Sequence, residues 1–525
     1  MEMSVAVKSL DNKSILVTGA TGFLAKLFVE KVLRTQPNVK KLYLLVRAHD
    51  AISAKTRVEK EVVSKELFDV LREKYGASFD SFFWSKVHAV QGDTTLENIG
   101  IRDVNLIEVL WREVDYIVHS AANTRFNERY DVSLSINTLG ARNITLFAKE
   151  CENLRMFLHI STAYVTKEKK GIISEEIPEF DQVLIPELEF ELTESKMKEL
   201  NANCTSKNEI KLYMKELGME RANKFGWPNV YSFTKAMGEL QITKFKGNLP
   251  VTILRPTIIL STYKEPFPGW IEGIRTIDKF MVSYGEGEIV CFPGHPDAIL
   301  DVIPGDMVVN AMLAAMTNTD SHFTNNLNIY HVGSSTVNTM NCSLFFEVSY
   351  KYFSMHPQIG KNGELITVQK LFFFPTLHAF SMYMFFRFKL PLQGLSLEEL
   401  SEEKRNQYKK LNQTFNNVMK MAKAYSPYSL MHGIFDDANT TMLRMRMNQE
   451  EKELFYFDPK CINWHQFLME IHIPGVIKHY MDNQCLLRKR ARIIEVASIL
   501  EVELHAIELG LDVAGDWRYK LLQCS

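Results

Sequence analysis

Residues 14–25 read Ser-Ile-Leu-Val-Thr-Gly-Ala-Thr-Gly-Phe-Leu-Ala, a buried strand that turns sharply through two glycines and continues into a helix. In this layout a dinucleotide pyrophosphate lies at the helix N-terminus, because Gly19 permits the turn and Gly22 lets the backbone approach a phosphate. An ordinary strand-to-helix turn has the same glycine spacing, but the apolar strand before it and the amphipathic helix after it favour the cofactor interpretation. We therefore predict cofactor contacts along the whole turn, from Gly19, Ala20, Thr21, Gly22, Phe23 and Leu24.

The composition is that of a large folded protein with almost no net charge. Its 525 residues, 46% hydrophobic and 24% charged, suffice for two domains or for one domain with large insertions. The net charge of -2 excludes a general attraction to nucleic acid or anionic lipid. The seven cysteines form no CxxC pair, so we expect a reducing compartment and neither a disulfide framework nor a metal site. The first strand begins at about Ser14, which leaves no room for a transit peptide and disfavours a plastid or mitochondrial address.

A second apolar strand, residues 41–47, ends in Arg47. In a dinucleotide-binding fold the side chain at the end of this strand meets the adenosine ribose. An acidic residue there favours NAD, whereas an arginine can pair with the additional phosphate of NADP. We therefore interpret Arg47 as selecting NADPH, and the alternative is a solvated arginine that closes a strand.

The next two strands also end in residues suited to a cofactor cleft. Asp93 follows the strand Val87–Val90, and its carboxylate is predicted to accept a hydrogen bond from the adenine amino group. A plain Gly-Asp turn is the alternative for Asp93. Ala121 and Ala122 follow the strand Tyr116–His119, and such small residues leave room for a flat ligand.

Strands and helices alternate over the first 160 residues, up to a fifth strand at Met156–Ile160. A charged, mostly helical insertion at about 167–229 then separates this strand from a sixth at 251–257, in which Pro256 ends the strand at the cofactor cleft. The alternation predicts an α/β fold with a doubly wound parallel sheet, whose ligands lie at the carboxyl ends of the strands.

Tyr231 and Lys235 are four residues apart on a predicted helix, so their side chains share one face. An ammonium close to a phenol stabilises the phenolate and lowers its pKa toward the range of a general acid, and it can also hold the nicotinamide ribose. A hydroxyl after the fifth strand completes the set. Between Ser161 and Thr162 we choose Thr162, because the register of the following Ala-Tyr-Val matches it better. With a hydride from the cofactor, these three groups would reduce a carbonyl.

The sequence resembles the plant-type alcohol-forming fatty acyl-CoA reductases, which are extended members of the short-chain dehydrogenase/reductase superfamily. The matching stretches are Val17–Ala25, Leu44–Arg47, Ser161–Val165, Tyr231–Lys235, Lys264–Gly273, Gly433–Asp437 and Phe457–Pro459, and the similarity ends at about Met481. The resemblance implies an NADPH-binding Rossmann core of the extended short-chain reductase type at 1–360. It also implies a mainly helical C-terminal domain at 361–481, followed by an extension of unassigned role at 482–525.

The resemblance implies the reaction as well. A long-chain or very-long-chain acyl-CoA is reduced by NADPH to an aldehyde with release of CoA, and a second NADPH reduces the aldehyde to a primary alcohol for wax, suberin or another surface lipid. Thr162, Tyr231 and Lys235 then form the catalytic set, while Gly19 and Arg47 are among the cofactor contacts. The expected location is the cytosolic face of the endoplasmic reticulum, as a peripheral protein, or the cytoplasm. The oligomeric state is left open.

Residues 371–386 form the most apolar stretch of the chain, but they are shorter than a bilayer span and include a proline and a histidine. We favour a buried core helix or a wall for the acyl chain, ahead of an interfacial membrane helix and, last, a transmembrane helix. The insertion is a second candidate wall. The four cations within residues 488–492 would either contact anionic headgroups or begin a solvated helix.

Two other functions fit parts of the pattern. A nucleotide-sugar epimerase or dehydratase shares the glycine turn and the Tyr/Lys pair. It would need a polar, arginine-rich second half, whereas this one is rich in Phe, Met and Leu. A catalytically silent lipid-binding protein of the same fold is disfavoured because Thr162, Tyr231 and Lys235 are all present.

Overall fold

The computed structural model describes residues 10–167, 170–178, 184–318, 327–360, 363–390, 402–431 and 433–480. Its centre is a seven-stranded sheet in which every pair of neighbours is parallel. The strands, in spatial order, are β11 (Leu327–Val332), β7 (Val251–Pro256), β5 (Met156–Ile160), β4 (Tyr116–His119), β1 (Ser14–Thr18), β2 (Lys41–Val46) and β3 (Val87–Gln91). The chain leaves β1 toward β2 and β3 and returns on its other side through β4, so the predicted doubly wound sheet is confirmed.

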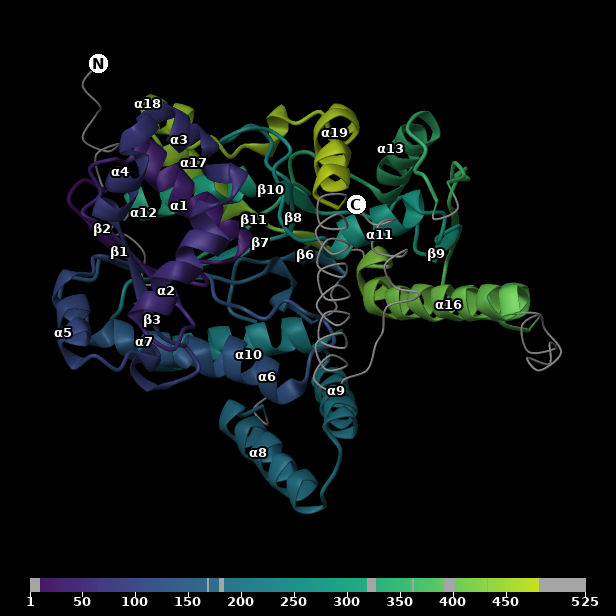
Figure 1. The fold of residues 1–525 in the computed structure, drawn as a ribbon, viewed down its shortest axis with the longest axis horizontal. Coiled ribbons are helices and arrows are strands. Elements are labelled where there is room, and N and C mark those ends of the chain that lie inside the picture. Colours follow the sequence, from purple (N-terminus) through teal and green to yellow (C-terminus); the bar gives the residue numbers. More distant parts are fainter. Residues whose placement is uncertain are drawn as a thin grey trace, which may run out of the picture.

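Helices cover both faces of this sheet (Figure 1), because successive side chains of each buried strand point to opposite sides. Ile15 and Val17 pack with α1 (Phe23–Thr35) and α12 (Gly305–Thr317). Leu16 packs instead with the other layer, which consists of α5 (Val104–Glu113), α7 (Gly140–Glu150) and α10 (Val230–Phe245). Three short helices lie in the crossover from β2 to β3, namely α2 (Ala51–Val58), α3 (Asp69–Tyr75) and α4 (Phe79–Lys86).

The Lys264–Gly273 loop fixes the position of α1. Phe23 stacks on Trp270 with ring centroids 5.1 Å apart, and Lys26 forms an ion pair with Glu272. The Asp306 carboxylate of α12 accepts hydrogen bonds from the backbone N–H groups of residues 263, 264 and 265. Lys264–Gly273, one of the stretches that carry the family resemblance, therefore holds the helix that follows the glycine turn.

The insertion contains two long helices, α8 (Pro186–Ala202) and α9 (Lys207–Lys224), which lie at the lower edge of the molecule in Figure 1. They pack on α6 (Tyr130–Leu134) through the buried Glu189, which pairs with Arg221 and accepts a 2.8 Å hydrogen bond from the Tyr130 hydroxyl. This arrangement places most of the insertion away from the cofactor cleft. Of the two long helices, only α9 reaches the cavity described below, through Met219.

The C-terminal segment returns to the reductase core. Strand β13 (Gly433–Phe435) pairs in parallel with β6 (Gly171–Ile173), which begins the insertion. Glu175 secures this junction by accepting hydrogen bonds from the backbone N–H groups of His331 and Asn439, at 2.7 and 2.5 Å. The remaining helices of this segment are α16 (Glu402–Ser429), α17 (Ala438–Arg446), α18 (Gln449–Leu454) and α19 (Trp464–Gln466).

The apolar stretch 371–386 is neither one helix nor fully buried. It comprises β12 (Phe372–Phe374), which pairs with β9 (Cys291–Pro293), and α14 (Leu377–Met384), which is followed by a π-helical turn at Phe385–Lys389. Phe380 and Met384 are buried, so part of the favoured interpretation holds, but the exposed fraction of Phe386 is 57%. No helix in the described parts of the chain is long and apolar enough to span a bilayer. The extension at 482–525, with its cations at 488–492, lies outside the described residues.

Candidate active site

A cavity of about 1290 Å³ opens at the carboxyl ends of the sheet strands. It extends from the glycine turn, past α10 and the loop after β7, to α11 (Thr276–Gly285), α13 (Cys342–Met355) and α16. Every site residue predicted from the sequence lines this cavity: Gly19, Ala20, Thr21, Gly22, Phe23, Leu24, Arg47, Asp93, Ala121, Ala122, Thr162, Tyr231, Lys235 and Pro256. The sheet thus brings together residues from six separate strand ends, although their individual roles remain predictions.

The glycine turn fits a dinucleotide pyrophosphate. Gly19 has a φ of +69°, and a Cβ at this position would lie 2.6 Å from the backbone nitrogen of Ala121. Gly22 is the N-cap of α1, and no side chain caps the first N–H groups of that helix. Because these uncapped N–H groups face the cavity at the positive end of a helix dipole, they suit an anionic ligand.

The adenosine end of the cleft carries two arginines rather than one. Arg47 is exposed, and Arg57 of α2, which also lines the cavity, donates a 2.8 Å hydrogen bond to the Arg47 carbonyl oxygen. No sequence motif marks Arg57, since only the packing of α2 beside β2 and β3 brings it there. Asp93 accepts hydrogen bonds from the backbone and hydroxyl of Thr95, which is the geometry of the Gly-Asp turn kept as the alternative.

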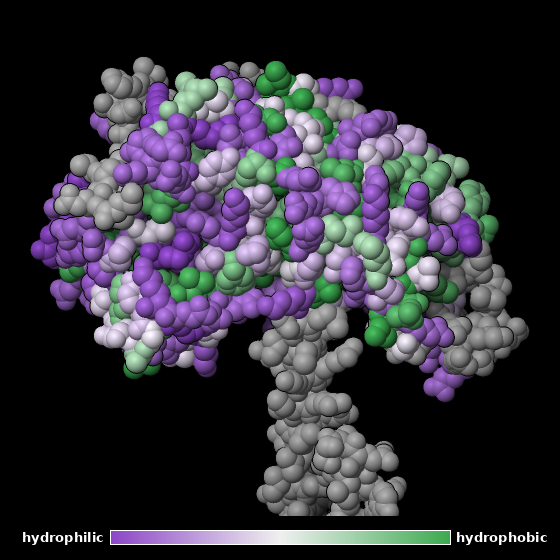
Figure 2. All heavy atoms as spheres, turned by 90° about the horizontal axis from the view of Figure 1, so that it is seen from above, coloured by the Kyte–Doolittle hydropathy of each residue, from purple (hydrophilic) through white to green (hydrophobic). Residues whose placement is uncertain are grey.

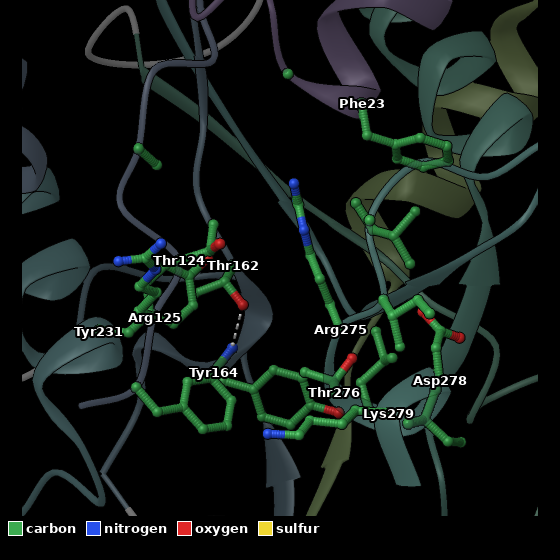
Figure 3. A pocket seen from close by; sticks show the side chains of 18 of the residues that line it. Phe23, Thr124, Arg125, Thr162, Tyr164, Tyr231, Arg275, Thr276, Asp278 and Lys279 are labelled. Atoms are coloured by element: carbon green, nitrogen blue, oxygen red, sulfur yellow. Dashed lines mark hydrogen bonds between the residues drawn. The ribbon is translucent and has the colours of Figure 1, made fainter. Parts of the chain in front are cut away.

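Tyr231 lies in the first turn of α10, whose N-cap Asn229 accepts a 2.9 Å hydrogen bond from the Ser232 backbone N–H. Burial raises the pKa of the Tyr231 phenol to about 12, while a hydrogen bond with Thr162 and the positive charge of Arg275 act in the opposite direction. The Thr162 oxygen also accepts a 3.3 Å hydrogen bond from the backbone N–H of Tyr164 (Figure 3), which orients the hydroxyl. Tyr231 and Thr162 therefore form a pair of hydroxyl donors at one place in the cavity.

Lys235 is placed differently from the sequence expectation. Its ammonium donates to the Ile160 carbonyl oxygen at 2.8 Å and lies 3.0 Å from Nε2 of His159, and both of these residues belong to β5. Burial lowers the pKa of Lys235 to about 8 and that of His159 well below its ordinary value, so the imidazole is a neutral acceptor. The expected lowering of the Tyr231 pKa toward neutrality is not found, because the burial of the phenol outweighs the groups that favour phenolate.

Several cavity residues were missed from the sequence because they come from segments without a motif. Figure 3 shows Arg275 and Lys279 reaching into the cavity from the α11 side, opposite Thr124, Arg125 and Thr162. Helix α16 adds two more tyrosines, Tyr425 and Tyr428, to the lining of the cavity. The ring of Phe126 lies between Tyr231, Tyr425 and Tyr428, at centroid distances of 6.1, 5.6 and 5.6 Å.

Four phenylalanine rings form an aromatic chamber in the wall of the cavity. Phe280 of α11 contacts Phe292 of β9 and Phe346 of α13, with ring centroids 4.5 and 5.0 Å apart. Phe346 in turn contacts Phe373 of β12 at 5.3 Å. All four rings line the cavity, and Phe373 is the residue of the apolar stretch 371–386 that does so.

Two family models match the chain, both described as male sterility protein. The NAD-binding model matches residues 17–312 and the sterile model matches residues 391–483. The first range contains the glycine turn and the hydroxyl pair. The second contains α16, which supplies Tyr425 and Tyr428 to the cavity. The described residues contain no group of three or more His, Cys, Asp or Glu side chains that could hold a metal ion.

Curated proteins match over nearly the whole chain. The alcohol-forming fatty acyl-CoA reductase of Simmondsia chinensis is 46% identical, over 92% of this chain and 100% of its own length. Fatty acyl-CoA reductase 8 and fatty acyl-CoA reductase 1 of Arabidopsis thaliana are each 45% identical, over 92% and 91% of this chain and 100% and 99% of theirs.

Solved structures share the fold at low sequence identity. The terminal R domain of the myxalamid biosynthetic pathway aligns over 90% of this chain and 92% of its own, with a TM-score of 0.57 and 16% identity. The reductase domain of a nonribosomal peptide synthetase from Mycobacterium tuberculosis aligns over 93% and 96%, with a TM-score of 0.52 and 17% identity. These two likenesses agree with the Rossmann-like fold of the chain.

Proposed function

The chain belongs to the fatty acyl-CoA reductase family, and from this premise we propose that it reduces long-chain or very-long-chain acyl-CoA to a primary alcohol with NADPH. One observation carries the proposal. A single cavity joins the glycine turn, the hydroxyl pair of Thr162 and Tyr231, and the aromatic chamber around Phe280 and Phe346. A cofactor, a reacting carbonyl and an apolar chain can therefore lie one after another along this cavity.

When bound, NADPH supplies a hydride to the carbonyl carbon of the substrate. Thr162 and Tyr231 donate hydrogen bonds to the carbonyl oxygen, where negative charge develops as the hydride adds. In the first reduction the resulting hemithioacetal loses CoA as its thiol and leaves the aldehyde. In the second, Tyr231 gives its proton to the alkoxide oxygen and is reprotonated from solvent. Each reduction consumes one hydride and one proton, so one alcohol requires two NADPH.

The choice of NADPH over NADH rests on Arg47 and Arg57. Both line the end of the cavity next to β2, where the adenosine ribose lies in a dinucleotide-binding fold. Two cations at that position favour a ribose that carries a phosphate, because charge-assisted hydrogen bonds are the strongest available to a guanidinium.

The aromatic chamber favours a substrate whose carbonyl is attached to a long acyl chain. The exposed fractions of Phe280 and Phe292 are 5% and 3%. Phe346 and Phe373 are only partly buried, so they offer surface to a ligand. Each methylene that leaves water contributes about 0.8 kcal/mol, so a long chain gains much of its affinity here. A nucleotide-sugar substrate would find few polar partners among these rings, which disfavours the epimerase alternative.

The test is turnover by the purified full-length protein. With NADPH and hexadecanoyl-CoA, octadecanoyl-CoA or a longer acyl-CoA, we expect NADPH oxidation and a primary alcohol identified by gas chromatography. The stoichiometry should be two NADPH per alcohol. A protein that binds the acyl-CoA without oxidising NADPH would instead be the catalytically silent lipid-binding alternative.

The pH dependence of aldehyde reduction should show whether turnover depends on the positive charge of Lys235. Its pKa of about 8 means that the ammonium loses its proton as the pH rises through 8, whereas Tyr231, with a pKa of about 12, keeps its proton. We therefore expect kcat/KM for a long-chain aldehyde to fall above pH 8. In Lys235→Arg the charge persists, because a guanidinium stays protonated below about pH 12, and the decline should move to higher pH. An unchanged decline in this variant would assign it to another group.

We further propose peripheral attachment to the cytosolic face of the endoplasmic reticulum. Hydrophobic residues gather toward the right of Figure 2, the end of the molecule that carries α13, β9 and α16 in Figure 1. After β12, the exposed large apolar side chains of α14 and its π-helical turn include Met382, Phe385 and Phe386, and Arg387 and Lys389 follow them. Apolar side chains next to cations suit the interface of an anionic membrane.

Vesicle sedimentation tests this surface. We expect Phe385→Ser/Phe386→Ser to reduce binding to vesicles of phosphatidylcholine and phosphatidylserine, because both side chains are at least 40% exposed and would enter the membrane interface. Ile52→Ser, which removes an 80% exposed isoleucine from the opposite end of the chain, is the matched control. Equal binding by both variants and the wild type would place the attachment elsewhere.

A further inference from the structure

The lining of the cavity is strongly basic, although the chain as a whole is nearly neutral. Among the described residues, three acidic side chains line it, namely Asp93, Glu272 and Asp278. Eight basic side chains do so: Arg47, Arg57, Arg125, Lys235, Arg275, Lys279, Lys420 and Lys423. The chain contains 61 basic and 63 acidic residues, so this excess is local and points to an anionic ligand.

Four of these cations form a group that the cofactor does not explain. Arg275 and Lys279 are four residues apart at the start of α11, and Lys420 and Lys423 are three apart on α16. The spacing of Lys420 and Lys423 places both on one face of α16, whereas Arg275 is the N-cap residue that precedes α11. All four side chains line the cavity. Figure 3 shows Arg275 and Lys279 extending into it. We call these four residues the mouth cations, because all four line the cavity and are exposed to solvent.

The mouth cations are not neutralised by ion pairs in the part of the chain that the structure describes. Among the described residues none of the four takes part in an ion pair, whereas Arg125, on the same cavity, is paired with Glu128 at 3.0 Å. The nearest carboxylate in sequence, Asp278, is buried and lies 3.1 Å from Nε2 of His472. Four uncompensated cations at one opening repel one another, and an anionic ligand would relieve that repulsion.

We propose that the mouth cations bind the phosphate groups of coenzyme A in the acyl-CoA substrate. The proposal rests on the proposed function and specifies how that substrate is held. The glycine turn and Arg47 with Arg57 account for the phosphates of the cofactor at the other end of the cavity. The mouth cations line the same cavity as Thr162 and Tyr231, so a ligand bound to them can extend to the reacting carbonyl. The acyl chain then enters the aromatic chamber while the flexible pantetheine arm leads outward to the cations.

The experiment compares substrates with and without phosphates. Lys279→Ala/Lys420→Ala/Lys423→Ala is assayed in the full-length protein with hexadecanoyl-CoA, with the hexadecanoyl thioester of pantetheine and with hexadecanal. Arg275 is left intact because its charge acts on Tyr231. The control, Lys409→Ala/Lys410→Ala, removes two exposed lysines from the same helix that do not line the cavity.

In the triple variant we expect KM for hexadecanoyl-CoA to rise about tenfold or more, since each lost charge-assisted contact costs up to about one tenfold step in affinity. KM for the pantetheine thioester and turnover of hexadecanal should match the wild type, which also shows that the variant is folded. Raising the salt concentration should increase KM for hexadecanoyl-CoA in the wild type but much less in the variant.

Three outcomes would overturn the proposal. The first is an unchanged KM for hexadecanoyl-CoA in the triple variant. The second is an equal rise of KM for both thioesters. The third is a loss of binding to anionic vesicles alone, which would mean that the cations bind a membrane. If the wild type itself reduces hexadecanal but neither thioester, the proposed function fails instead. The assay thus separates a failure of the phosphate site from a failure of the reductase assignment.

Discussion

Replacing Tyr231 by phenylalanine should lower alcohol formation by about a thousandfold or more, the scale of losing both a general acid and a hydrogen bond to the developing oxyanion. The side chain of Tyr231 is partly buried and lines the cavity beside Thr162, and the phenol keeps its proton because desolvation raises its pKa to about 12. It is therefore suited to donate to a carbonyl oxygen in the ground state and to transfer its proton only when that oxygen becomes basic.

The measurement is kcat for hexadecanal and for an acyl-CoA, together with the Kd of NADPH from fluorescence titration. The Kd should be unchanged, since the ring of Tyr231 remains in place. Tyr43→Phe is the control, because its hydroxyl, 3.1 Å from Glu113, lies outside the cavity and its loss should leave kcat at the wild-type level. Wild-type turnover by Tyr231→Phe would mean that another group protonates the substrate.

Arg47→Asp should reverse the preference between the two nicotinamide cofactors. The substitution removes one cation from the adenosine end of the cavity and adds a carboxylate that repels a ribose phosphate. The ratio of kcat/KM for NADPH to that for NADH should therefore fall about a hundredfold, the scale of losing a charge-assisted hydrogen bond and adding a like-charge contact. Arg57→Ala should lower the same ratio, because Arg57 lines the same part of the cavity.

Steady-state kinetics with each cofactor and a fixed aldehyde concentration give this ratio. Arg102→Asp is the control, since it makes the same change of charge at an exposed residue that does not line the cavity. Equal losses with NADPH and NADH in Arg47→Asp would show that Arg47 does not contact the additional phosphate.

The strands predicted from the sequence agree with the observed sheet, because the sequence patterns that mark a strand extend over only a few residues. Each strand of a parallel sheet buried on both faces is a short apolar run, and the residues just after it lie at the carboxyl edge whatever the rest of the chain does. For this reason Gly19, Asp93, Ala121 and Thr162 could all be placed in one cavity from the sequence. The tight turn at Gly19 follows from its own position as well, because its φ is positive and a Cβ would meet Ala121.

Features that depend on the meeting of distant segments could not be predicted in the same way. The spacing of Tyr231 and Lys235 gives the helix face that they share, but not the partners of the lysine. The proximity of β5 decides those partners and directs the ammonium to His159 and Ile160. Arg57 and Arg275 carry no motif, and the pairing of β6 with β13 joins residues more than 250 positions apart.

The sequence by itself determined the doubly wound sheet, the glycine turn and the residue types at the strand ends, since hydrophobic periodicity and turn chemistry act over a few residues. Only the tertiary structure decided the electrostatics of the site. The pKa values of Tyr231 and Lys235 depend on burial and on charges from other elements, and the mouth cations become a group only where α11 and α16 meet one cavity. Burial and through-space charge are properties of the packed chain, which no local stretch of sequence contains.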